Sequence, residues 1–398
     1  MLTRRRLLRN LGLGLAASGV PGLTMARIDT DARFVLFVLR GALDGLAFAP
    51  PYGDGHYSSQ RGELALGSPG SDGGALKLDG LFGLHPSLRN MHELYGRRQA
   101  LLIHAVASPY RSRSHFDGQD VLENGAKEAG LARDGWLNRA IGGLRDPAGA
   151  IALAQNTPLV LRGDNAVTSW APSRLPDTSD DTLQRIRELY SGDEFFAPRL
   201  AQALESQAIA DSMNNAQEMK RTNELQQWKQ TAETAARFLT ADNGPRIAVL
   251  EAGGWDTHAN QGAASGYLAN RLAALDGAFK ALASGLGESW GRTVVTVVTE
   301  FGRTVSVNGT RGTDHGTATA AMLLGGAVDG GRILADWPGL AAGNFYQGRD
   351  LYPTIDLRSV FKTILLSHLA LPEHYVEDVV FPDSRSAEPL ARVIHRTS

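Results

Sequence analysis

The fold is decided by the stretch VVTVVTEFGRT, residues 294–304. Its β-branched apolar run, 294–299, has the length of a strand and predicts a buried β-strand. A carboxylate, Glu300, follows directly where this strand is expected to end. Ligands of open α/β sheets bind outside the carboxyl ends of the strands. The stretch therefore predicts a buried sheet with a polar site at its edge.

Two further apolar runs lead into acidic loops. Residues 247–250 are followed by Asp256 and His258, and residues 33–39 are followed by Asp44. Since one residue separates Asp256 from His258, both side chains leave an extended backbone on the same face and can converge on one ion. Imidazole is the commonest metal-binding side chain. These segments predict a metal site, although a helix-capping Asp and a His bonded to a backbone carbonyl would give the same pattern.

A fourth segment, Gly312-Thr313-Asp314-His315-Gly316, lies just downstream of the strand at 294–299. Its two glycines permit an irregular backbone that turns both polar side chains inward. We predict His315 as a metal ligand, and Asp314 either as a ligand or as a residue that orients the imidazole. A polar turn with an Asx-type hydrogen bond is the alternative.

Glu300 needs a partner, because a buried carboxylate is costly to leave unpaired. We expect it to bind the ion or to pair with Arg303, which follows in the same segment. A carboxylate of this kind could also activate a water molecule as a general base.

Ser114 is expected at the start of a helix that runs to about residue 123. A nucleophile there would benefit from the helix dipole, and Arg111 and Arg113 could hold a phosphate or sulfate. Ser114 and Asp117 also have the spacing of a capping box, which is a purely structural explanation. His115 could equally be the functional group.

Composition places the chain among globular proteins. It has 398 residues, 43% of them hydrophobic, which is enough for one large α/β domain. The charge is balanced, with 40 basic and 42 acidic residues, so no broad nucleic-acid-binding surface is expected. Cysteine is absent, which excludes thiolate ligands and cysteine nucleophiles. Any metal must be held by oxygen and imidazole.

Predicted strands alternate with predicted helices along the chain. This order is typical of a doubly wound, mainly parallel α/β sheet with helices on both faces. A polar segment at about 181–241 has no strand signal and is expected to be helical. Strands are expected at 33–39, 100–107, 247–251, 294–299 and 320–324, and helices at about 85–99, 265–286 and 357–371.

The first 26 residues are typical of a twin-arginine export signal. TRRRLLR at 3–9 precedes an apolar run at 11–20 and small residues near 26. A membrane anchor or the basic start of a helix is the alternative, but the apolar run is well short of the roughly 20 residues that span a bilayer. We expect a folded protein exported to the periplasm or beyond, with residues 27–398 as a single domain.

These motifs, in this order, resemble one exported bacterial family, catalogued only as domain of unknown function 1501 and related to the alkaline phosphatase and sulfatase superfamily. The resemblance covers nearly the whole mature chain. It rests on the twin-arginine start and on the motifs RGALDGL at 40–46, SRSHFDGQD at 112–120, GWDTH at 254–258, TEFGRT at 299–304 and GTDHG at 312–316.

The resemblance implies an alkaline-phosphatase-like sheet with metals at its carboxyl edge. By similarity, Asp44 matches the first-strand metal Asp, His315 matches the last metal His, and Ser114 falls near the nucleophile. The sequence departs from the pattern at two positions, where Glu300 replaces an Asp and Phe301 replaces a His ligand. The departures imply one metal ion, or none, in place of a two-zinc site.

We therefore predict a periplasmic hydrolase of phosphate or sulfate esters that uses a divalent metal such as zinc, calcium, manganese or magnesium. Its substrate would be a small or polymer-borne anionic ester, and neither nucleic acid nor a stable membrane span is expected. The alternative is a non-catalytic exported binding protein on a degenerate version of the fold. The predicted catalytic residues are Ser114, His115 and Arg303, and the predicted metal ligands are Asp44, Asp256, His258, Glu300, Asp314 and His315.

Overall fold

The computed structural model describes residues 31–144, 149–171 and 223–395, together with scattered positions between 186 and 204. Within these ranges a nine-stranded sheet has the order β10-β4-β9-β8-β1-β7-β5-β6, and β11 pairs with β4. The strands are β1 Arg33–Leu39, β4 Ala100–Ala107, β5 Ala150–Ala152, β6 Thr168–Ser169, β7 Ile247–Ala252, β8 Thr293–Thr299, β9 Thr319–Leu324, β10 Arg332–Leu334 and β11 Ile355–Asp356. A separate two-stranded sheet joins β2 Leu76–Lys77 to β3 Gly83–Leu84.

The large sheet is mainly parallel, as predicted. At its centre β1 runs parallel to β7 and β8, with Leu36 opposite Val249 and Thr296. The exception is β9, which is antiparallel to both β4 and β8. The strands predicted at 33–39, 100–107, 247–251, 294–299 and 320–324 all occur within one residue of the expected bounds. The amino end of β9 consequently lies at the same edge as the carboxyl ends of β4, β8, β1 and β7.

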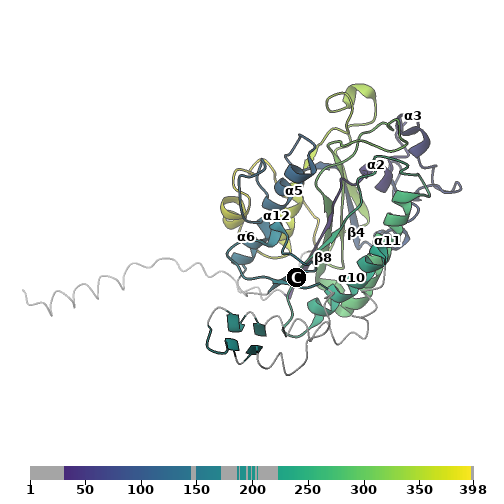
Figure 1. Ribbon diagram of the computed structural model, residues 1–398. Helices are drawn as coiled ribbons and strands as arrows, with labels where there is room; N and C mark the ends of the chain where they lie inside the picture. The colour runs from purple at the N-terminus through teal and green to yellow at the C-terminus, as the bar shows by residue number, and fades with distance from the viewer. Residues whose placement is uncertain are drawn as a thin grey trace, which may run out of the picture. The chain divides into compact units, whose positions relative to one another are not determined.

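Both faces of the sheet are covered by helices, which confirms the predicted fold class. Every residue of β1 is buried, and alternate side chains enter two different cores because successive residues of a strand face opposite ways. Val35 and Phe37 pack with residues of α10 (Glu224–Thr240) and α11 (Tyr267–Leu286). Phe34 and Leu36 pack with residues of α5 (His115–Asn124), α6 (Trp136–Gly142) and α12 (Leu357–Ser367). The two groups of helices lie on opposite sides of β4 and β8 in Figure 1.

The described helices are α2 Gly45–Phe48, α3 Tyr57–Arg61, α4 Arg89–Gly96, α5 His115–Asn124, α6 Trp136–Gly142, α10 Glu224–Thr240, α11 Tyr267–Leu286, α12 Leu357–Ser367 and α13 Glu373–Tyr375. The helix predicted at 85–99 is shorter than expected. It begins at Arg89 because Asp276, far away in the sequence on α11, accepts hydrogen bonds from the amides of Asn90 and Met91 at 2.9 Å each. A cap supplied by another helix has no local sequence signal.

Several expectations fall partly or wholly outside the described residues. The export signal at 1–26 lies outside them, and of the helical segment at 181–241 the main described part is α10. Among the residues that the structure describes, no helix has both the length and the apolar character needed to cross a membrane.

Candidate metal centre

The candidate site lies at the edge where β4, β7 and β8 end and where β9 begins. The loop after β4 brings His115, which opens α5, and the loop after β7 brings Asp256. The connection from β8 to β9 leaves and returns at this edge, and Arg303 and His315 face each other across it in an isolated antiparallel bridge. Three connections that are distant in sequence therefore supply one site.

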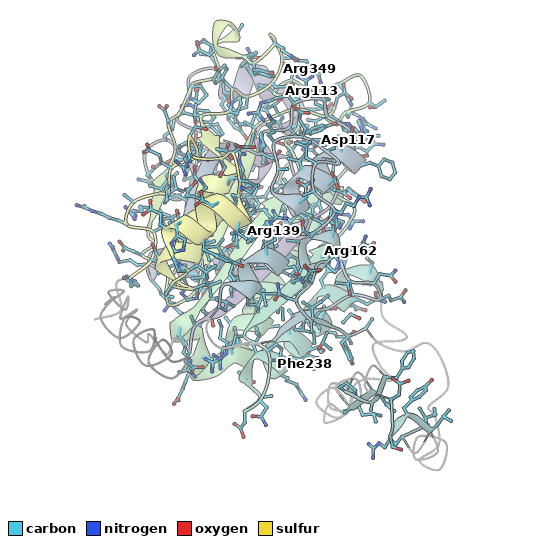
Figure 2. The ribbon with its side chains drawn as sticks, turned by 90° about the vertical axis from the view of Figure 1, so that its left-hand side faces the viewer. Arg113, Asp117, Arg139, Arg162, Phe238 and Arg349 are labelled. Carbon is cyan, nitrogen blue, oxygen red and sulfur yellow. The ribbon has the colours of Figure 1, made fainter. Side chains whose placement is uncertain are left out.

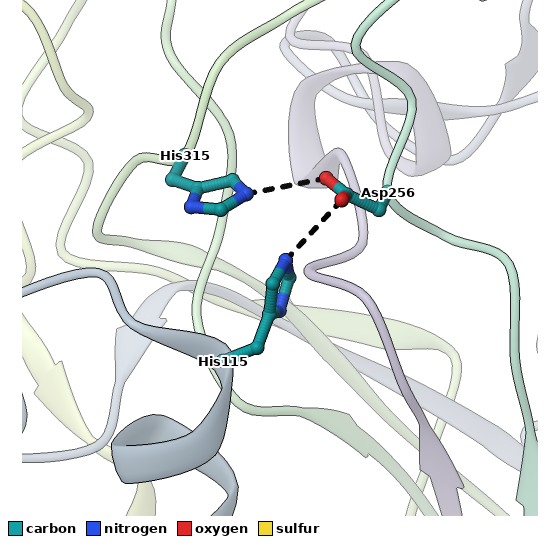
Figure 3. A group of neighbouring side chains, drawn as sticks. All are labelled: His115, Asp256 and His315. Atoms are coloured by element: carbon teal, nitrogen blue, oxygen red, sulfur yellow. Dashed lines mark hydrogen bonds and ion pairs between the residues drawn. The ribbon is translucent and has the colours of Figure 1, made fainter.

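Three side chains form the centre of the site (Figure 3). One ligand atom each from His115, Asp256 and His315 lies within 4.8 Å of the other two. Nε2 of His115 is 3.4 Å from Oδ2 of Asp256, and Nε2 of His315 is 3.2 Å from Oδ1. Both imidazoles thus present the same ring nitrogen to the two oxygens of one carboxylate.

The opposite nitrogen of each ring is held by an acceptor. Nδ1 of His115 donates to Oε1 of Glu300 at 2.8 Å, and Nδ1 of His315 donates to the backbone carbonyl of Arg113 at 2.9 Å. Because a carbonyl oxygen can only accept, Nδ1 of His315 carries the hydrogen, and Nε2 keeps its lone pair in the neutral ring. Acceptors of this kind behind a histidine are characteristic of metal ligands.

His258 is a third imidazole at the same point. Its Nε2 lies 3.0 Å from Oδ1 of Asp256 and 3.0 Å from Nε2 of His315. Its Nδ1 faces Oδ1 of Asp314 at 3.3 Å, and that carboxylate is fixed by Asn308 at 3.0 Å. Asp314 therefore orients an imidazole, the second of its two predicted roles, but the ring is that of His258.

The protonation of these rings is compatible with either a shared proton or a bound cation. Burial lowers the pKa of His315 and favours its neutral form, so its lone pair faces a carboxylate oxygen and another ring nitrogen. The hydrogen bond with Glu300 raises the pKa of His115, whose Nε2 is buried and has no hydrogen-bond partner among the described residues. Electron-rich atoms at these distances repel unless a proton or a metal ion lies between them.

The donor set fits a divalent ion held by His115, Asp256 and His315, with His258 beside them. Two or three imidazoles and one carboxylate suit zinc and similar first-row metals, whereas magnesium and calcium prefer sites made only of oxygen. Of the metals considered from the sequence, zinc and manganese therefore fit better than calcium and magnesium.

Arg303 fixes the carboxylate of the centre. Its Nη1 donates to Oδ1 of Asp256 at 2.6 Å, and Thr313 holds the same guanidinium through its hydroxyl, 3.1 Å from Nε, and its carbonyl. Burial tends to raise the pKa of Asp256, but the bond with Arg303 and the nearby positive charges outweigh it and hold the pKa below its ordinary value. Asp256 is therefore ionised, and Arg303 pairs with it instead of with Glu300.

Glu300 is fully buried behind His115. It accepts hydrogen bonds from His115, from the Gly41 amide at 2.9 Å and from the Thr299 hydroxyl at 2.8 Å. Burial by itself would raise the pKa of Glu300, but these bonds lower it below the ordinary value. The carboxylate thus positions an imidazole and reaches neither solvent nor the centre directly.

Asp44 is occupied by partners within the protein. It caps α2 through the amides of Leu46 and Ala47, both at 3.1 Å, and its other oxygen pairs with buried Arg61 and with Gln261 at 2.7 Å. The structure does not bring Asp44 into the cluster of His115, Asp256 and His315. Arg61 and Gln261 have no motif that could have revealed this role.

Ser114 occupies the N-cap position of α5, but its side chain makes no capping hydrogen bond. The capping-box interpretation is therefore wrong, and Asp117 instead accepts from the Tyr110 hydroxyl at 3.2 Å. The preceding residue, Arg113, has a positive φ of 62°, which is costly for a residue with a side chain. This conformation accompanies the carbonyl contact to His315, a backbone role that no side-chain pattern could predict.

Phe301 forms an apolar wall of the site. Its ring stacks on His115 at a centroid distance of 5.0 Å and lies 5.3 Å from the ring of His315. A side chain at Gly118 would meet the same ring at 2.9 Å, which accounts for a glycine inside α5. Phe301, which stands where the family resemblance implies a histidine ligand, thus packs against the rings of His115 and His315.

Comparisons with known proteins give a family and distant structural similarities. The family model described as "Protein of unknown function (DUF1501)" matches residues 98–380. No curated protein is similar enough in sequence to count as a match.

Three solved structures illustrate the structural similarities. The C-terminal periplasmic domain of EcEptC from Escherichia coli, in complex with zinc, is 10% identical over 74% of this chain and 72% of its own, with a TM-score of 0.34. The phosphonate monoester hydrolase of Agrobacterium radiobacter is 10% identical over 85% and 74%, with a TM-score of 0.34. A mutant of TAB5 alkaline phosphatase with magnesium bound is 14% identical over 74% and 90%, with a TM-score of 0.35. Similarity at this level carries no information about substrate.

Proposed function

The chain belongs to the DUF1501 family of proteins of unknown function, and we propose that it is a metal-dependent hydrolase of phosphate or sulfate esters. The observation that carries the proposal is the convergence of three imidazole Nε2 atoms on the carboxylate of Asp256. The side chains of these residues are between 25% and 45% exposed, so the centre is open to a ligand from solvent.

Some residues would bind the ion, and others would hold those ligands in place. His115, Asp256 and His315 would bind the ion, with His258 beside them. A divalent ion polarises an anionic ester and lowers the pKa of a bound water. Glu300 keeps the hydrogen of His115 on Nδ1, and Arg303 keeps Asp256 ionised and in place. Phe301 shields two of the rings from water on one side.

Two groups are candidates for the attack on the ester. The Ser114 hydroxyl is not used in capping, and its residue adjoins His115. The other candidate is water, for which Glu300 cannot serve directly as a base because it is fully buried. If Ser114 is the nucleophile, Ser114→Ala and Ser114→Asp will both abolish turnover and leave the melting temperature nearly unchanged. Undiminished turnover in either variant would assign the attack to water.

The proposal also includes the cellular setting inferred from the sequence. Residues 1–26 would direct export through the twin-arginine machinery, and the substrate would be a small or polymer-borne anionic ester outside the cytoplasm. Loading of the ion before export would be compatible with translocation of a folded protein.

Metal content tests the proposal most directly. Natively exported protein, and protein repleted with zinc, manganese, calcium or magnesium, should retain one divalent ion per chain after dialysis when measured by inductively coupled plasma analysis. Hydrolysis of aryl phosphates and aryl sulfates should then depend on that ion. Protein that retains no ion under any of these conditions would refute the proposal. If Asp256→Ala and His315→Ala changed neither metal content nor cellular phenotype, the exported binding protein would be the better explanation.

A further inference from the structure

The loop between β4 and α5 carries two arginines with different surroundings. Arg113 is paired, since its guanidinium donates to Asp350 at 2.8 Å and to Gln347 at 2.6 Å. Arg111 donates only to two backbone carbonyls, those of Ser108 and Tyr110. Among the residues that the structure describes, no carboxylate lies within ion-pair distance of Arg111. Its half-buried charge is therefore uncompensated by any direct partner.

A second arginine lies in the segment paired with the end of β4. Arg358, in the first turn of α12, donates to Asp356 through Nε at 3.1 Å and Nη2 at 2.7 Å. Its side chain is only 9% exposed, and its Nη1 is buried without a hydrogen-bond partner in the described part of the chain. The hydroxyl of Thr354 is a second buried polar group that has no partner among the residues that the structure describes.

The register of the sheet places these groups beside the Arg111 loop. The Thr354 amide donates to the carbonyl of Ala105 at 2.9 Å, and Asp356 is the register partner of Ala107. The loop that holds Arg111 leaves β4 immediately after this point. The charges of Asp356 and Arg358 both act on Arg111, whose pKa is lowered chiefly by burial.

The local charges favour an anion. Asp356 pairs with Arg358, and in the described part of the chain Arg111 has no carboxylate within ion-pair distance, so positive charge exceeds negative charge here. The first turn of α12 adds the positive end of a helix dipole. Buried donors without acceptors and a desolvated cation both cost free energy, and an oxyanion would relieve both through charge-assisted hydrogen bonds.

We propose that Arg111, Arg358 and Thr354 form an oxyanion-binding subsite, which takes a second acidic group of the substrate whose ester lies at the metal centre. The first half of this inference, that these three residues bind an oxyanion, concerns binding alone. The second half, that the oxyanion belongs to the substrate, rests on the proposed function. Arg111 and His115 lie on one loop, and Arg113, between them, holds His315 through its carbonyl. Figure 2 shows Arg113 close to Arg349, whose guanidinium donates to the carbonyl of His315 at 2.7 Å. The substrate would accordingly carry two anionic groups.

The binding half is tested on the full chain freed of metal with a chelator, so that no ion can bind the probe. Inorganic sulfate, inorganic phosphate and acetate are each titrated at constant ionic strength, adjusted with sodium chloride, and followed by calorimetry and thermal shift. We expect saturable binding of at least one of these oxyanions. Arg111→Gln should weaken it by about tenfold, the loss expected for one charge-assisted hydrogen bond. Arg97→Gln, which alters an exposed arginine paired with Glu93, should leave it unchanged.

The outcomes separate the two halves. Absence of saturable binding, or equal binding by the parent and Arg111→Gln, would overturn the subsite and indicate that a bridging water satisfies Arg358 and Thr354. Arg111→Lys should retain part of the affinity, which a purely structural arginine would not predict. Because the titration is done without metal, a failure of the proposed hydrolase would leave this result standing. If binding holds but substrates with one and two anionic groups react with equal KM, the link to the metal centre would be refuted.

Discussion

Two groups of histidines in this protein, one in the core and one at the sheet edge, differ in their hydrogen bonds. In the interior, Nε2 of His104 lies 3.0 Å from the carbonyl of Ala49, and its Nδ1 accepts from the Ala105 amide at 2.8 Å. His85 has the same arrangement, with Ala263 at 2.9 Å and the Ser87 amide at 3.1 Å. In these core histidines both ring nitrogens are satisfied within the protein.

At the sheet edge the second nitrogen of each ring has no backbone partner among the described residues. Nδ1 of His115, His258 and His315 faces an acceptor, while Nε2 faces other electron-rich atoms. The difference shows how function can be inferred from hydrogen bonding. A histidine with two backbone partners completes a fold, whereas three Nε2 atoms grouped around one carboxylate form an arrangement that can take a ligand.

The largest expected effect is loss of metal binding. His115→Ala and His315→Ala each remove a converging nitrogen, so stoichiometric binding of zinc or manganese should be lost. His92→Ala removes an imidazole outside the site, one that bonds to the carbonyl of Lys77, and the variant should bind metal like the parent protein. Inductively coupled plasma analysis of dialysed protein measures the difference. Retention of the ion by both site variants would mean that the histidines at the sheet edge, like those in the core, do not bind metal.

The second effect is acid destabilisation by the core histidines. Burial lowers the pKa of His104 and of His368 to about 4, from an ordinary value of 6.5. Between these values the unfolded chain binds protons that the folded chain does not, so the free energy of unfolding should fall as pH decreases from 6.5 to 4. The full loss is about 3 kcal/mol for each group. Urea unfolding of metal-free protein across this range, with His368→Gln as the comparison, should show a shallower fall in the variant.

A third and smaller effect concerns Glu300, which holds His115 without touching the ion. Glu300→Gln should lower metal affinity about 10- to 100-fold, as is usual when the acceptor behind a metal-binding histidine is altered. Glu251→Gln is a matched control, because Glu251 pairs with Arg40 at 2.5 Å and lies outside the centre. Competition with a metallochromic chelator would measure both. Equal affinity in the two variants would mean that Glu300 serves folding alone.

The smallest effect separates Ser114 from a true helix cap. The side chain of Asn223 accepts from the Gln226 amide at 3.0 Å, whereas the Ser114 side chain makes no such bond. Asn223→Ala should therefore cost about 1 kcal/mol of stability. Ser114→Ala should cost less than about 0.5 kcal/mol, the range of changes that break no specific feature. Thermal melts of both variants provide the measurement. A larger loss of stability for Ser114→Ala than for Asn223→Ala would mean that the Ser114 hydroxyl does cap its helix.

The sequence predicted the strands, and the closeness of several polar side chains at one edge, for a physical reason. A run such as 294–299 is buried on both faces, and parallel strands bring their ends to one edge, so Asp256, His258 and His315 could be placed together. Their partners could not be predicted. The carbonyl of Arg113 has no side-chain signature, and the pairing of Asp44 with Arg61 depends on a loop that only the tertiary fold brings near. Glu300 looked like a ligand because a buried carboxylate needs a partner, but that partner is an imidazole from another strand end.

The reversal of β9 has a consequence for the order in which the protein matures. Because β8 and β9 are antiparallel neighbours, Glu300, Arg303 and His315 lie in one local excursion of the chain and can come together early in folding. His115 and Asp256 arrive only when β4 and β7 have taken their places in the sheet, which requires closure of much longer loops. One half of the centre, which comprises Glu300, Arg303 and His315, is thus close in sequence. The other half, which comprises His115 and Asp256, depends on contacts between distant parts of the chain. An ion held by both halves would report that the sheet is complete, so metal uptake should be a late event that distinguishes finished chains from partly folded ones.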